Sequence, residues 1–567
     1  MRRLSLLYLV VFGLVLLLWI LSASPWPQPG DSAEFVAQGA LGGVVHPPGY
    51  PLATLLFWLT ARLPGMTPAW WAAAANALVM LGALVLLRRT WGQRRALHLL
   101  LVAWVASTPL VWQYALTPEA FSGLLCFASL FVLVFHRPEL YRRGSVVLLL
   151  ALSMLHHHTI VFLLPLLGSA AWAQRRDGGA HARALVAGAS ALLLYGVLYL
   201  FIFDGTVPGA WRSLADVGDV AAHFLRADYG SFVLQRAGAG APLSEKLLFV
   251  TQALAPSLLG VGLVVGSGWG NIDGLLRRRV LALVGLALLI AVGFTALANL
   301  SLLDAGQRIL ARFLLLPLWL AFAGAGVALA GVTGTRARLV AGVLSVLVVS
   351  NVVAGRHRFT GEQASLVARV VKQTLHDAPP DSELVLTTDS AFFIARYFQA
   401  IEGTRPDLRL VSLPKFVPRE EGPAVFDQLL AVAPGRGLER RGFVWVLTPQ
   451  AGELRFDCSP ASQELRLGQN PFTEFDETGV FALRVGSCQL LEGQWYFSRG
   501  DVARALSSWE AGLALNPWHP HLRERRCQAL QRLAPAQLGA CEGHLDELLA
   551  TLAPEYLGFK FALPGLE

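Results

Sequence analysis

The chain has 567 residues, of which 54% are hydrophobic and only 15% are charged, and its formal net charge is +8. Soluble domains carry about 25% charged residues, so this composition excludes an ordinary soluble enzyme and indicates a membrane protein. The positive charge does not indicate nucleic-acid binding, because the arginines flank apolar runs, as they do in cytoplasmic loops. These are Arg2, Arg3, Arg88, Arg89, Arg94, Arg95, Arg142, Arg143 and residues 277–279.

The N-terminus reads Met-Arg-Arg followed by an apolar run over residues 5–23. That run is long for the apolar part of a cleaved signal peptide, and many more apolar runs follow it. We therefore expect a retained signal anchor.

An acidic pair follows this first run, in the stretch GDSAEFVAQGALGGVVHPPGYP from Gly30 to Pro51. Asp31 and Glu34 are three residues apart, so they share one face of a short helix, and acids are favoured in a first turn by the helix dipole. A carboxylate pair at a membrane surface can provide a general base. From residue types alone, a helix turn with solvated acids explains the pattern equally well.

The acidic pair together with the following His-Pro-Pro-Gly-Tyr-Pro resembles a membrane family first described as a domain of unknown function. Its eukaryotic member is the endoplasmic-reticulum O-mannosyltransferase of plexin-type IPT domains. That family is similar to the GT-C glycosyltransferases, which use polyprenyl-phosphate sugars and carry an essential acid in their first extracytoplasmic loop. The resemblance covers roughly residues 1–355.

The resemblance implies a role for each acid. Asp31 would take a proton from an acceptor hydroxyl as that hydroxyl attacks the anomeric carbon, and polyprenyl phosphate would leave with inversion. Glu34 would hold sugar or acceptor hydroxyls, or raise the pKa of Asp31 by like-charge repulsion.

Hydropathy predicts eleven membrane spans, several of them shorter than the ~20 residues usual for a spanning helix. The apolar stretch 144–174 is interpreted as two spans that meet at His156–His158, because this reading keeps every arginine cluster on the cytoplasmic side. Pro51 to Leu63 is too short to span and is expected to lie on the outer face or to re-enter. The spans are 5–23, 69–87, 96–112, 119–136, 144–156, 159–174, 184–203, 247–266, 279–299, 309–330 and 337–354.

This topology places the N-terminus inside and the C-terminal part outside, in a bacterial inner membrane. The acidic loop, Glu119, the histidines and the loop 204–246 then all meet the outer face. We expect three domains: a GT-C-like transmembrane catalytic domain over 1–355, an extracytoplasmic α/β domain over 356–487, and a tetratricopeptide-like helical segment over 488–567. The predicted fold class is a polytopic α-helical membrane protein with these C-terminal additions.

The α/β domain is predicted from short runs rich in β-branched and apolar residues. Strands are expected at 383–387, 408–413, 443–448 and 479–485, and helices at 390–402 and 424–432. Residues 488–517 resemble a tetratricopeptide helix pair, with Gly493, Tyr496, Gly500, Ala503, Ala505, Trp509 and Pro517 at suitable positions.

A disulfide between Cys527 and Cys541 is predicted, because each cysteine lies seven residues from a helix break at Ala534. In an antiparallel helix pair, equal distances from the turn place residues at the same height, and seven residues is close to two turns. An extracytoplasmic location allows the bond to persist. Cys458 and Cys488 are a second possible pair for which the spacing offers no geometric argument.

Two further polar residues are candidates for substrate contacts. His46 lies in a proline-rich turn and is a candidate to hydrogen-bond Asp31 or a phosphate; a histidine that merely satisfies loop backbone is the alternative. Glu119 lies in TPEAF, where Thr117 suits a helix N-cap and Pro118 the first helical position, so a structural role competes with a substrate role.

His156, His157 and His158 also match a family pattern with histidine at this point. One or two of them could contact the donor phosphate, and His157 and His158 are the candidates. Side chains of three adjacent residues project in different directions from a regular helix, which argues against a shared metal. Arg308 and Arg312 lie four residues apart on one helix face, and Arg312-Phe313 resembles the family's Arg-Phe segment. Arginine matches phosphate geometry, so both are candidates to hold the lipid phosphate, with interfacial snorkelling as the alternative.

The leading hypothesis is a glycosyltransferase that moves a sugar, possibly mannose, from a polyprenyl-phosphate sugar to an exported protein or glycan. No cofactor is required for this chemistry, and a divalent metal stays an open question. The alternatives are a transporter or flippase, for which the sequence shows no inverted pair of broken helices, and a membrane-anchored scaffold, which leaves the acidic motif unexplained.

Overall fold

The computed structural model describes residues 2–92, 96–228, 241–298, 305–358, 361–386, 389–412, 437–441, 444–448, 454–458 and 485–551. The chain forms two compact units. The first comprises Met1–Pro25 and Gln38–Gly361, and the second comprises Trp26–Ala37 and Glu362–Glu567. The short helix α2 (Asp31–Leu41) begins in the second unit and ends in the first.

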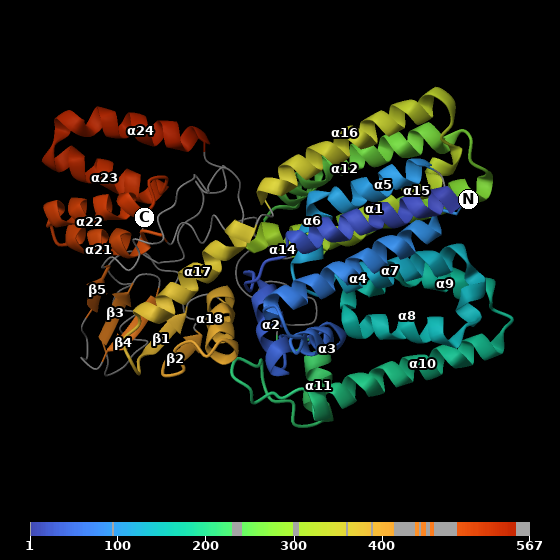
Figure 1. Cartoon of the computed structure of the whole chain (residues 1–567), viewed down its shortest axis with the longest axis horizontal. Helices are drawn as coiled ribbons and strands as arrows, with labels where there is room; N and C mark the ends of the chain where they lie inside the picture. Colours follow the sequence, from blue (N-terminus) through green and yellow to red (C-terminus); the bar gives the residue numbers. More distant parts are fainter. Residues whose placement is uncertain are drawn as a thin grey trace. The chain divides into compact units, whose positions relative to one another are not determined.

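The first unit is built from helices (Figure 1). Seven are long and apolar enough to cross a membrane, and the pair α5–α6, bent by 63° at Thr108, is a possible eighth. The helices are α1 (Arg2–Leu21), α3 (Pro51–Thr60), α4 (Pro68–Thr90), α5 (Ala96–Ser107), α6 (Pro109–Leu116), α7 (Phe121–His136), η1 (Pro138–Arg142), α8 (Gly144–His156), η2 (His158–Leu163), α9 (Leu164–Ala173), α10 (Gly178–Val197), η3 (Leu198–Ile202), α11 (Val217–Phe224), α12 (Leu243–Trp269), α13 (Gly274–Leu297), α14 (Ala305–Phe313), α15 (Leu315–Ala328), η4 (Leu329–Gly331) and α16 (Gly334–Arg358).

Each of the eleven expected spans coincides with one helix or with two or three consecutive helices, which confirms a polytopic helical membrane protein. The count of eleven stays a prediction, because α7, α8 and the η2–α9 pair are shorter than a usual spanning helix. The apolar segment after the acidic motif is the short helix α3, as its length led us to expect.

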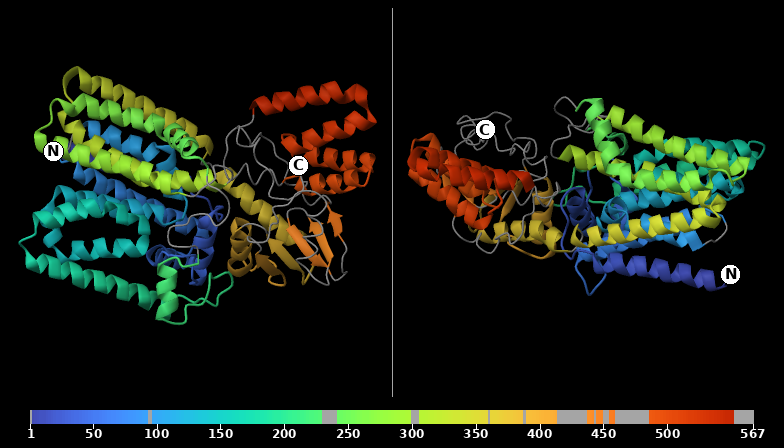
Figure 2. Two further views of the ribbon diagram at one scale, coloured as in Figure 1. Left: turned by 180° about the vertical axis from the view of Figure 1, so that it is seen from behind. Right: turned by 90° about the horizontal axis from the view of Figure 1, so that it is seen from above.

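The stretch 144–174 folds as a helical hairpin. α8 ends at His156, His157 is extended, and the chain restarts as η2 and α9. α9 packs back against η1, the turn that precedes α8, so the chain has reversed direction (Figure 2). The predicted break at the three histidines is therefore confirmed.

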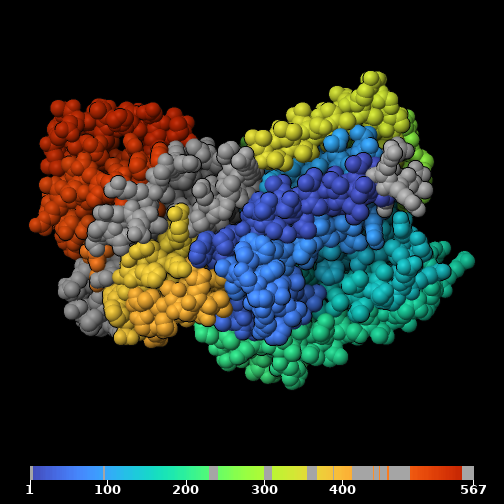
Figure 3. All heavy atoms as spheres, in the orientation of Figure 1, coloured from blue at the N-terminus to red at the C-terminus, as the bar shows by residue number. Residues whose placement is uncertain are grey.

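α15 lies at the centre of the first unit and is buried along its whole length. It packs against α7, α12 and α13, and the indole N–H of Trp319 donates to Ser129 Oγ at 2.8 Å. α1 is placed differently: it lies on the surface of the unit (Figure 3) and exposes the apolar side chains of Leu6, Leu9 and Leu14. An exposed apolar helix on a unit this hydrophobic indicates contact with lipid.

The second unit contains a five-stranded mixed sheet in the order β2-β1-β4-β3-β5. Its elements are α17 (Gly361–Asp377), β1 (Glu383–Leu386), α18 (Asp389–Ile401), β2 (Arg409–Ser412), β3 (Gly437–Arg441), β4 (Val444–Thr448) and β5 (Leu454–Asp457). β1 pairs with β2 in parallel and with β4 antiparallel, while β3 pairs antiparallel with β4 and in parallel with β5.

The predicted strands at 383–387, 408–413 and 443–448 and the helix at 390–402 are confirmed. β3 and β5 were not predicted, because GLERR and LRFD are too polar to resemble strands. The predicted helix at 424–432 and all but the last residue of the predicted strand at 479–485 lie outside the described residues.

The C-terminal helices pack in sequence order: α21 (Ser487–Ser498), α22 (Val502–Leu515), α23 (Pro520–Leu533) and α24 (Leu538–Thr551), with the short turn η6 (Pro535–Gln537) before the last. Gly493 admits the Trp509 ring, since a Cβ there would lie 2.2 Å from the indole nitrogen. The disulfide between Cys527 and Cys541 is confirmed, with Cα atoms 5.7 Å apart, and Cys458 and Cys488 form a second one. The membership of these helices in the tetratricopeptide family stays a prediction.

Candidate functional site

The His-Pro-Pro-Gly-Tyr-Pro motif forms a tight turn in the first unit. The peptide bond between Pro47 and Pro48 is cis, and the Gly49 N–H donates to the His46 carbonyl at 2.8 Å. Gly49 and Tyr50 both have positive φ, 86° and 46°, and α3 begins at the next residue. The turn thus orients the His46 and Tyr50 side chains just before a helix.

Neighbouring elements fix this turn. Tyr195 of α10 donates its hydroxyl to the Pro48 carbonyl at 2.7 Å. Gly49 has no room for a side chain, because a Cβ would lie 2.0 Å from the Tyr199 hydroxyl and 2.8 Å from His223 Nε2. Only glycine satisfies both this close approach and the positive φ.

The segment between α2 and the turn is held by the large loop after η3. Gly43 pairs with Asp204, the Asp204 N–H donates to the Gly42 carbonyl at 2.8 Å, and the Trp211 N–H donates to the Val44 carbonyl at 2.8 Å. In this loop Asp228 accepts hydrogen bonds from the Trp211 indole at 2.7 Å and from Arg212 at 3.4 Å. The loop is therefore ordered around the motif.

His223 of α11 lies fully buried in this loop, next to Gly49. Burial, with smaller contributions from nearby His46 and Arg212, lowers the pKa of His223 to about 3. The imidazole is consequently neutral at physiological pH.

The three histidines divide into different roles. His156 is structural: its Nε2 donates to the Ala120 carbonyl at 2.8 Å, over Gly123, where a Cβ would collide with the ring. His157 Nδ1 lies 3.2 Å from the Thr159 N–H and 2.8 Å from the Thr159 hydroxyl. Since Nδ1 accepts the backbone N–H, the neutral imidazole of His157 carries its proton on Nε2. His158 instead packs edge-on against Phe224 at 4.7 Å.

Glu119 and Arg312 form a buried ion pair beside His157. Their charged atoms are 3.7 Å apart, and their side chains are 6% and 18% exposed. The Arg312 guanidinium also lies over the rings of Phe121 and Phe313, at 5.8 and 5.9 Å.

Ring contacts connect these groups into one cluster, which we call the outer-turn cluster. His46 contacts Tyr50, Tyr50 contacts His157, and His157 contacts Phe121, with centroid distances of 5.4, 5.4 and 5.1 Å. The outer-turn cluster comprises His46, Tyr50, Glu119, Phe121, His157, Arg312 and Phe313. Four of the sequence-predicted residues, His46, Glu119, His157 and Arg312, are thus brought together.

Two expectations about individual residues need comment. The predicted N-cap at Thr117 was wrong: α7 begins at Phe121, and the Thr117 hydroxyl donates back to the Gln113 carbonyl at 2.9 Å. The buried Asn76 amide donates to the Tyr114 and Thr117 carbonyls at 2.8 and 2.7 Å, at the point where α6 ends and residues 117–120 follow a non-helical path. Arg308 lies on α14 four residues before Arg312, as predicted, but its side chain lies outside the described residues.

Asp31 and Glu34 occupy the first turn of α2, as predicted. Glu34 is 4% exposed and Asp31 is half-buried. Both residues belong to the segment Trp26–Ala37 of the second unit.

Sequence reasoning missed Asn76, Tyr50, Tyr195, Tyr199 and His223. A single asparagine within the alanine-rich WWAAAANALV is a signal that was available, since a polar side chain in an apolar helix needs a buried partner. The tyrosines gave no such signal, because tyrosine is common near membrane surfaces.

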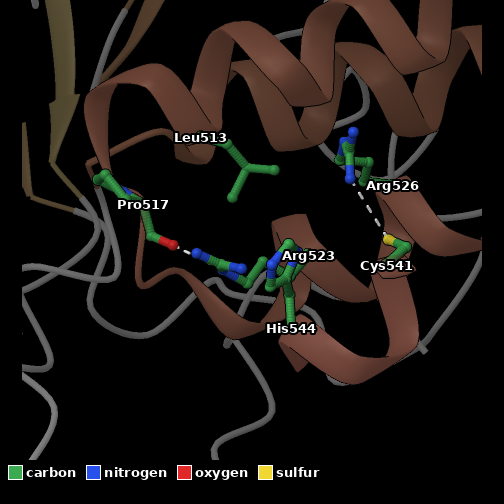
Figure 4. A pocket seen from close by; sticks show the side chains of 6 residues that line it. All are labelled: Leu513, Pro517, Arg523, Arg526, Cys541 and His544. Carbon is green, nitrogen blue, oxygen red and sulfur yellow. Dashed lines mark hydrogen bonds between the residues drawn. The ribbon is translucent and has the colours of Figure 1, made fainter. Parts of the chain in front are cut away.

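A cavity among the C-terminal helices was considered as a second site (Figure 4). It is lined by Leu513, Pro517, Arg523, Arg526, Cys541 and His544. Both arginines are already engaged, since Arg523 donates to the Pro517 carbonyl at 2.6 Å and Arg526 pairs with Glu510 at 3.1 Å. The cavity therefore offers little uncompensated charge to a ligand.

Comparison with known proteins finds a curated relative with a similar sequence and a solved structure with a distant likeness. No protein-family model matches the chain. The protein O-mannosyl-transferase TMEM260 of Mus musculus is 26% identical over 414 residues, which cover 67% of this chain. The match covers 59% of the relative's own length. The crystal structure of ArnT from Cupriavidus metallidurans in the apo state aligns over 78% of this chain and 98% of that one, with 13% identity and a TM-score of only 0.33.

The sequence relationship to an O-mannosyl-transferase agrees with the motif in and after α2 and with the polytopic helical fold. This similarity and the polytopic helical fold support a membrane glycosyltransferase of the GT-C superfamily.

Proposed function

We propose that this protein transfers a sugar from a polyprenyl-phosphate sugar to a hydroxyl group of an exported acceptor, and that the acceptor is a protein. The observation that carries the proposal is the acidic first turn of α2, which occurs in a chain related to a protein O-mannosyl-transferase. That relative's name makes mannose the first sugar to test.

In the proposed reaction, the acceptor oxygen attacks the anomeric carbon, and the bond from that carbon to the phosphate oxygen breaks. Asp31 takes the hydroxyl proton. Polyprenyl phosphate leaves with the bonding electron pair, and its phosphate gains one negative charge. One displacement inverts the anomeric centre. Glu34 would hold the hydroxyls of the sugar or the acceptor.

The outer-turn cluster supplies groups suited to the donor phosphate. A guanidinium presents several N–H donors in a fixed plane, and Arg312 is the candidate for the phosphate contact, with Arg308 as the second. His157 carries a proton on Nε2 and His46 lies within the same cluster, so both are candidate donors to a phosphate oxygen. His158 is the weaker candidate, because its ring packs against Phe224.

We further propose that the protein lies in a bacterial inner membrane with its N-terminus inside and its C-terminal domain outside. The arginine-rich turns support this orientation: Arg142 of η1 pairs with Asp177, the N-cap of α10, at 3.2 Å, so two predicted cytoplasmic turns lie together.

The decisive experiment incubates the purified full-length protein with a panel of polyprenyl-phosphate sugars and an acceptor, and measures released polyprenyl phosphate. Asp31→Asn should lower the rate about 100- to 10,000-fold, because the amide keeps the shape of the side chain but cannot take the proton. Asp273→Asn is the matched control, since Asp273 caps α13 and asparagine also caps helices well.

The outcomes separate the proposed activity from transport. A flippase or transporter would move the intact lipid-linked sugar and release no polyprenyl phosphate. Full activity of the Asp31→Asn variant would remove Asp31 from the mechanism. An arm with EDTA tests whether a divalent cation takes part.

A further inference from the structure

The segment that contains Asp31 and Glu34 packs against the C-terminal part of the chain. Trp26–Ala37 lies about 30 residues from the N-terminus, yet it belongs to the same compact unit as the α/β domain. Within that unit, residues of α17 and α18 contact the segment before Pro29, and a residue of α18 contacts it after Pro29.

The first contact is an aromatic and cationic anchor on Trp26. The Trp26 ring meets the buried Phe398 ring of α18 edge-on at 5.8 Å. The Lys372 ammonium of α17 lies 5.1 Å from both rings and is itself paired with Glu402 at 2.8 Å. An ammonium held by a carboxylate over two aromatic faces favours one position of the Trp26 ring.

The second contact is a hydrogen bond at the residue before α2. The Gly30 N–H donates to Ser390 Oγ of α18 at 2.7 Å, across 360 residues of sequence. Gly30 has a φ of 80°, which L-residues with side chains rarely adopt, and α2 starts at Asp31. This bond therefore fixes the backbone at the point that sets the direction of the first helical turn.

We propose that Ser390, supported by the Trp26–Lys372–Phe398 anchor, is a positioning residue that sets the orientation of the Asp31 and Glu34 carboxylates. The α/β domain thereby acts as part of the catalytic apparatus rather than as an appended module. This inference rests on the proposed function, in which Asp31 is the base.

A contact that serves only packing would give a different result from one that positions a base. Loss of a packing contact lowers stability and reduces the amount of folded enzyme, but leaves the kcat of the folded fraction unchanged. Misplacing a base by about 1 Å can lower kcat by about 100-fold, while donor binding, which uses other groups, keeps its KM.

The test uses the full-length protein and three serine variants. Ser390→Ala removes the acceptor of the Gly30 N–H, and Ser390→Thr keeps it. Ser382→Ala is the matched control, because Ser382 lies in the same unit and donates only locally, to the Pro379 carbonyl at 2.8 Å. Trp26→Phe, which shortens the anchor but stays aromatic, provides an independent variant. Hydrogen–deuterium exchange over residues 26–37 reports the anchoring, and steady-state kinetics with the polyprenyl-phosphate sugar report its effect.

We expect Ser390→Ala to speed exchange in residues 26–37 and to lower kcat about 10- to 100-fold with the donor KM unchanged. Trp26→Phe should also speed exchange and lower kcat, while Ser390→Thr and Ser382→Ala should resemble the wild type.

Unchanged hydrogen–deuterium exchange in Ser390→Ala and Trp26→Phe overturns the anchoring, whatever the activity. Faster exchange with a wild-type kcat overturns the positioning role. Wild-type protein that releases no polyprenyl phosphate refutes the proposed function itself, and the positioning role falls with it.

Discussion

At the scale of single residues, the Glu119–Arg312 pair shows why a simple deletion would be hard to interpret. Glu119 is buried and Arg312 is only 18% exposed, and removing one partner of a buried ion pair costs about 3–5 kcal/mol through the charge that is left behind. A loss of activity in Arg312→Ala would therefore mix a folding defect with a binding defect.

A double variant separates the two effects. Arg312→Ala should lower both the stability and the donor affinity, whereas Arg312→Ala combined with Glu119→Gln should recover most of the stability. Donor affinity should stay about 10- to 100-fold weaker in both, since a hydrogen bond to a charged group contributes about 1.5–3 kcal/mol. Thermal unfolding and donor titration measure the two quantities. Wild-type donor affinity in the double variant would reduce Arg312 to a structural residue.

His223 gives a prediction about pH. Its pKa in the folded protein is about 3, below the unfolded value of about 6.5, so the unfolded chain takes up the proton first. The contribution of His223 to stability is complete above pH 6.5 and is lost progressively as the pH falls towards 3. At pH 5 the loss should be roughly 2 kcal/mol, because one pKa unit corresponds to about 1.4 kcal/mol.

The comparison of pH 7.5 with pH 5 tests this in unfolding experiments. His223→Gln cannot titrate, so its loss of stability between the two pH values should be smaller than that of the wild type by this amount. Equal losses in the two proteins would show that His223 does not titrate in this way.

At this scale, the residues of the site could be predicted from the sequence where they belong to a recognisable motif. They were harder to predict where side-chain packing determines the role of each residue. The positions of Asp31 and Glu34 in a first turn, and the meeting of His46, Glu119, His157 and Arg312, follow from the motif and the topology. The different roles of the three histidines could not be predicted in this way. They depend on Gly123 and the Ala120 carbonyl, which lie more than 30 residues from His156 in the sequence.

At the scale of elements, the contact between α7 and α8 depends on a missing side chain. A Cβ on Gly123 would lie 1.9 Å from the His156 ring, which is hydrogen-bonded to the Ala120 carbonyl. Gly123→Ala should therefore lower stability by about 1–3 kcal/mol through overpacking. Gly168→Ala, in α9, is the control, since nothing lies within 4 Å of its Cβ position and alanine favours a helix.

Thermal unfolding in detergent compares these two glycine variants with the wild type. An equal effect of the two substitutions would mean that His156 moves aside without cost, and that the α7–α8 packing has room for a methyl group at position 123.

Helices were predicted well from apolar runs, and their ends were predicted less well. The N-cap assigned to Thr117 was wrong because the Thr117 hydroxyl donates back to the Gln113 carbonyl at the end of the preceding helix, where the buried Asn76 amide of another helix also bonds the Tyr114 and Thr117 carbonyls. Local sequence rules assume that a helix end is capped by its neighbours in sequence, and a buried amide from elsewhere overrides them. The strands β3 and β5 were missed for a related reason, since pairing and not hydrophobic pattern places GLERR and LRFD in the sheet.

At the scale of the whole molecule, the hairpin at 144–173 determines the predicted topology. Because the chain reverses at His157, the turn after α9 is expected on the same side as the turn before α8, and the arginine pattern predicts that this side is cytoplasmic. Cysteines introduced at Gly178 and at Gly361 should therefore differ in intact cells: a membrane-impermeant reagent should label position 361 and leave 178 unlabelled. Outside labelling at position 178 would reverse the assignment.

The division of the chain into units was the part least accessible from the sequence. Composition changes near residue 355 and predicts a boundary there, but no local pattern indicates that residues 26–37 pack with the C-terminal part. That assignment comes from Trp26, Gly30 and their partners more than 340 residues later, and contacts at such separation leave no periodic signal.

The bond between Gly30 and Ser390 also has a consequence for biosynthesis. A ribosome adds about 5–20 residues per second, so the 360 residues between these partners take roughly 20–70 s to synthesise. During that interval the early helices can already enter the bilayer, while Gly30 at the start of α2 still lacks its partner. In the proposed function and orientation, a newly made chain would therefore reach its full transferase activity only after α18 has been translocated and folded, and a chain that ends before Ser390 would keep its early helices but lack the partner of Gly30.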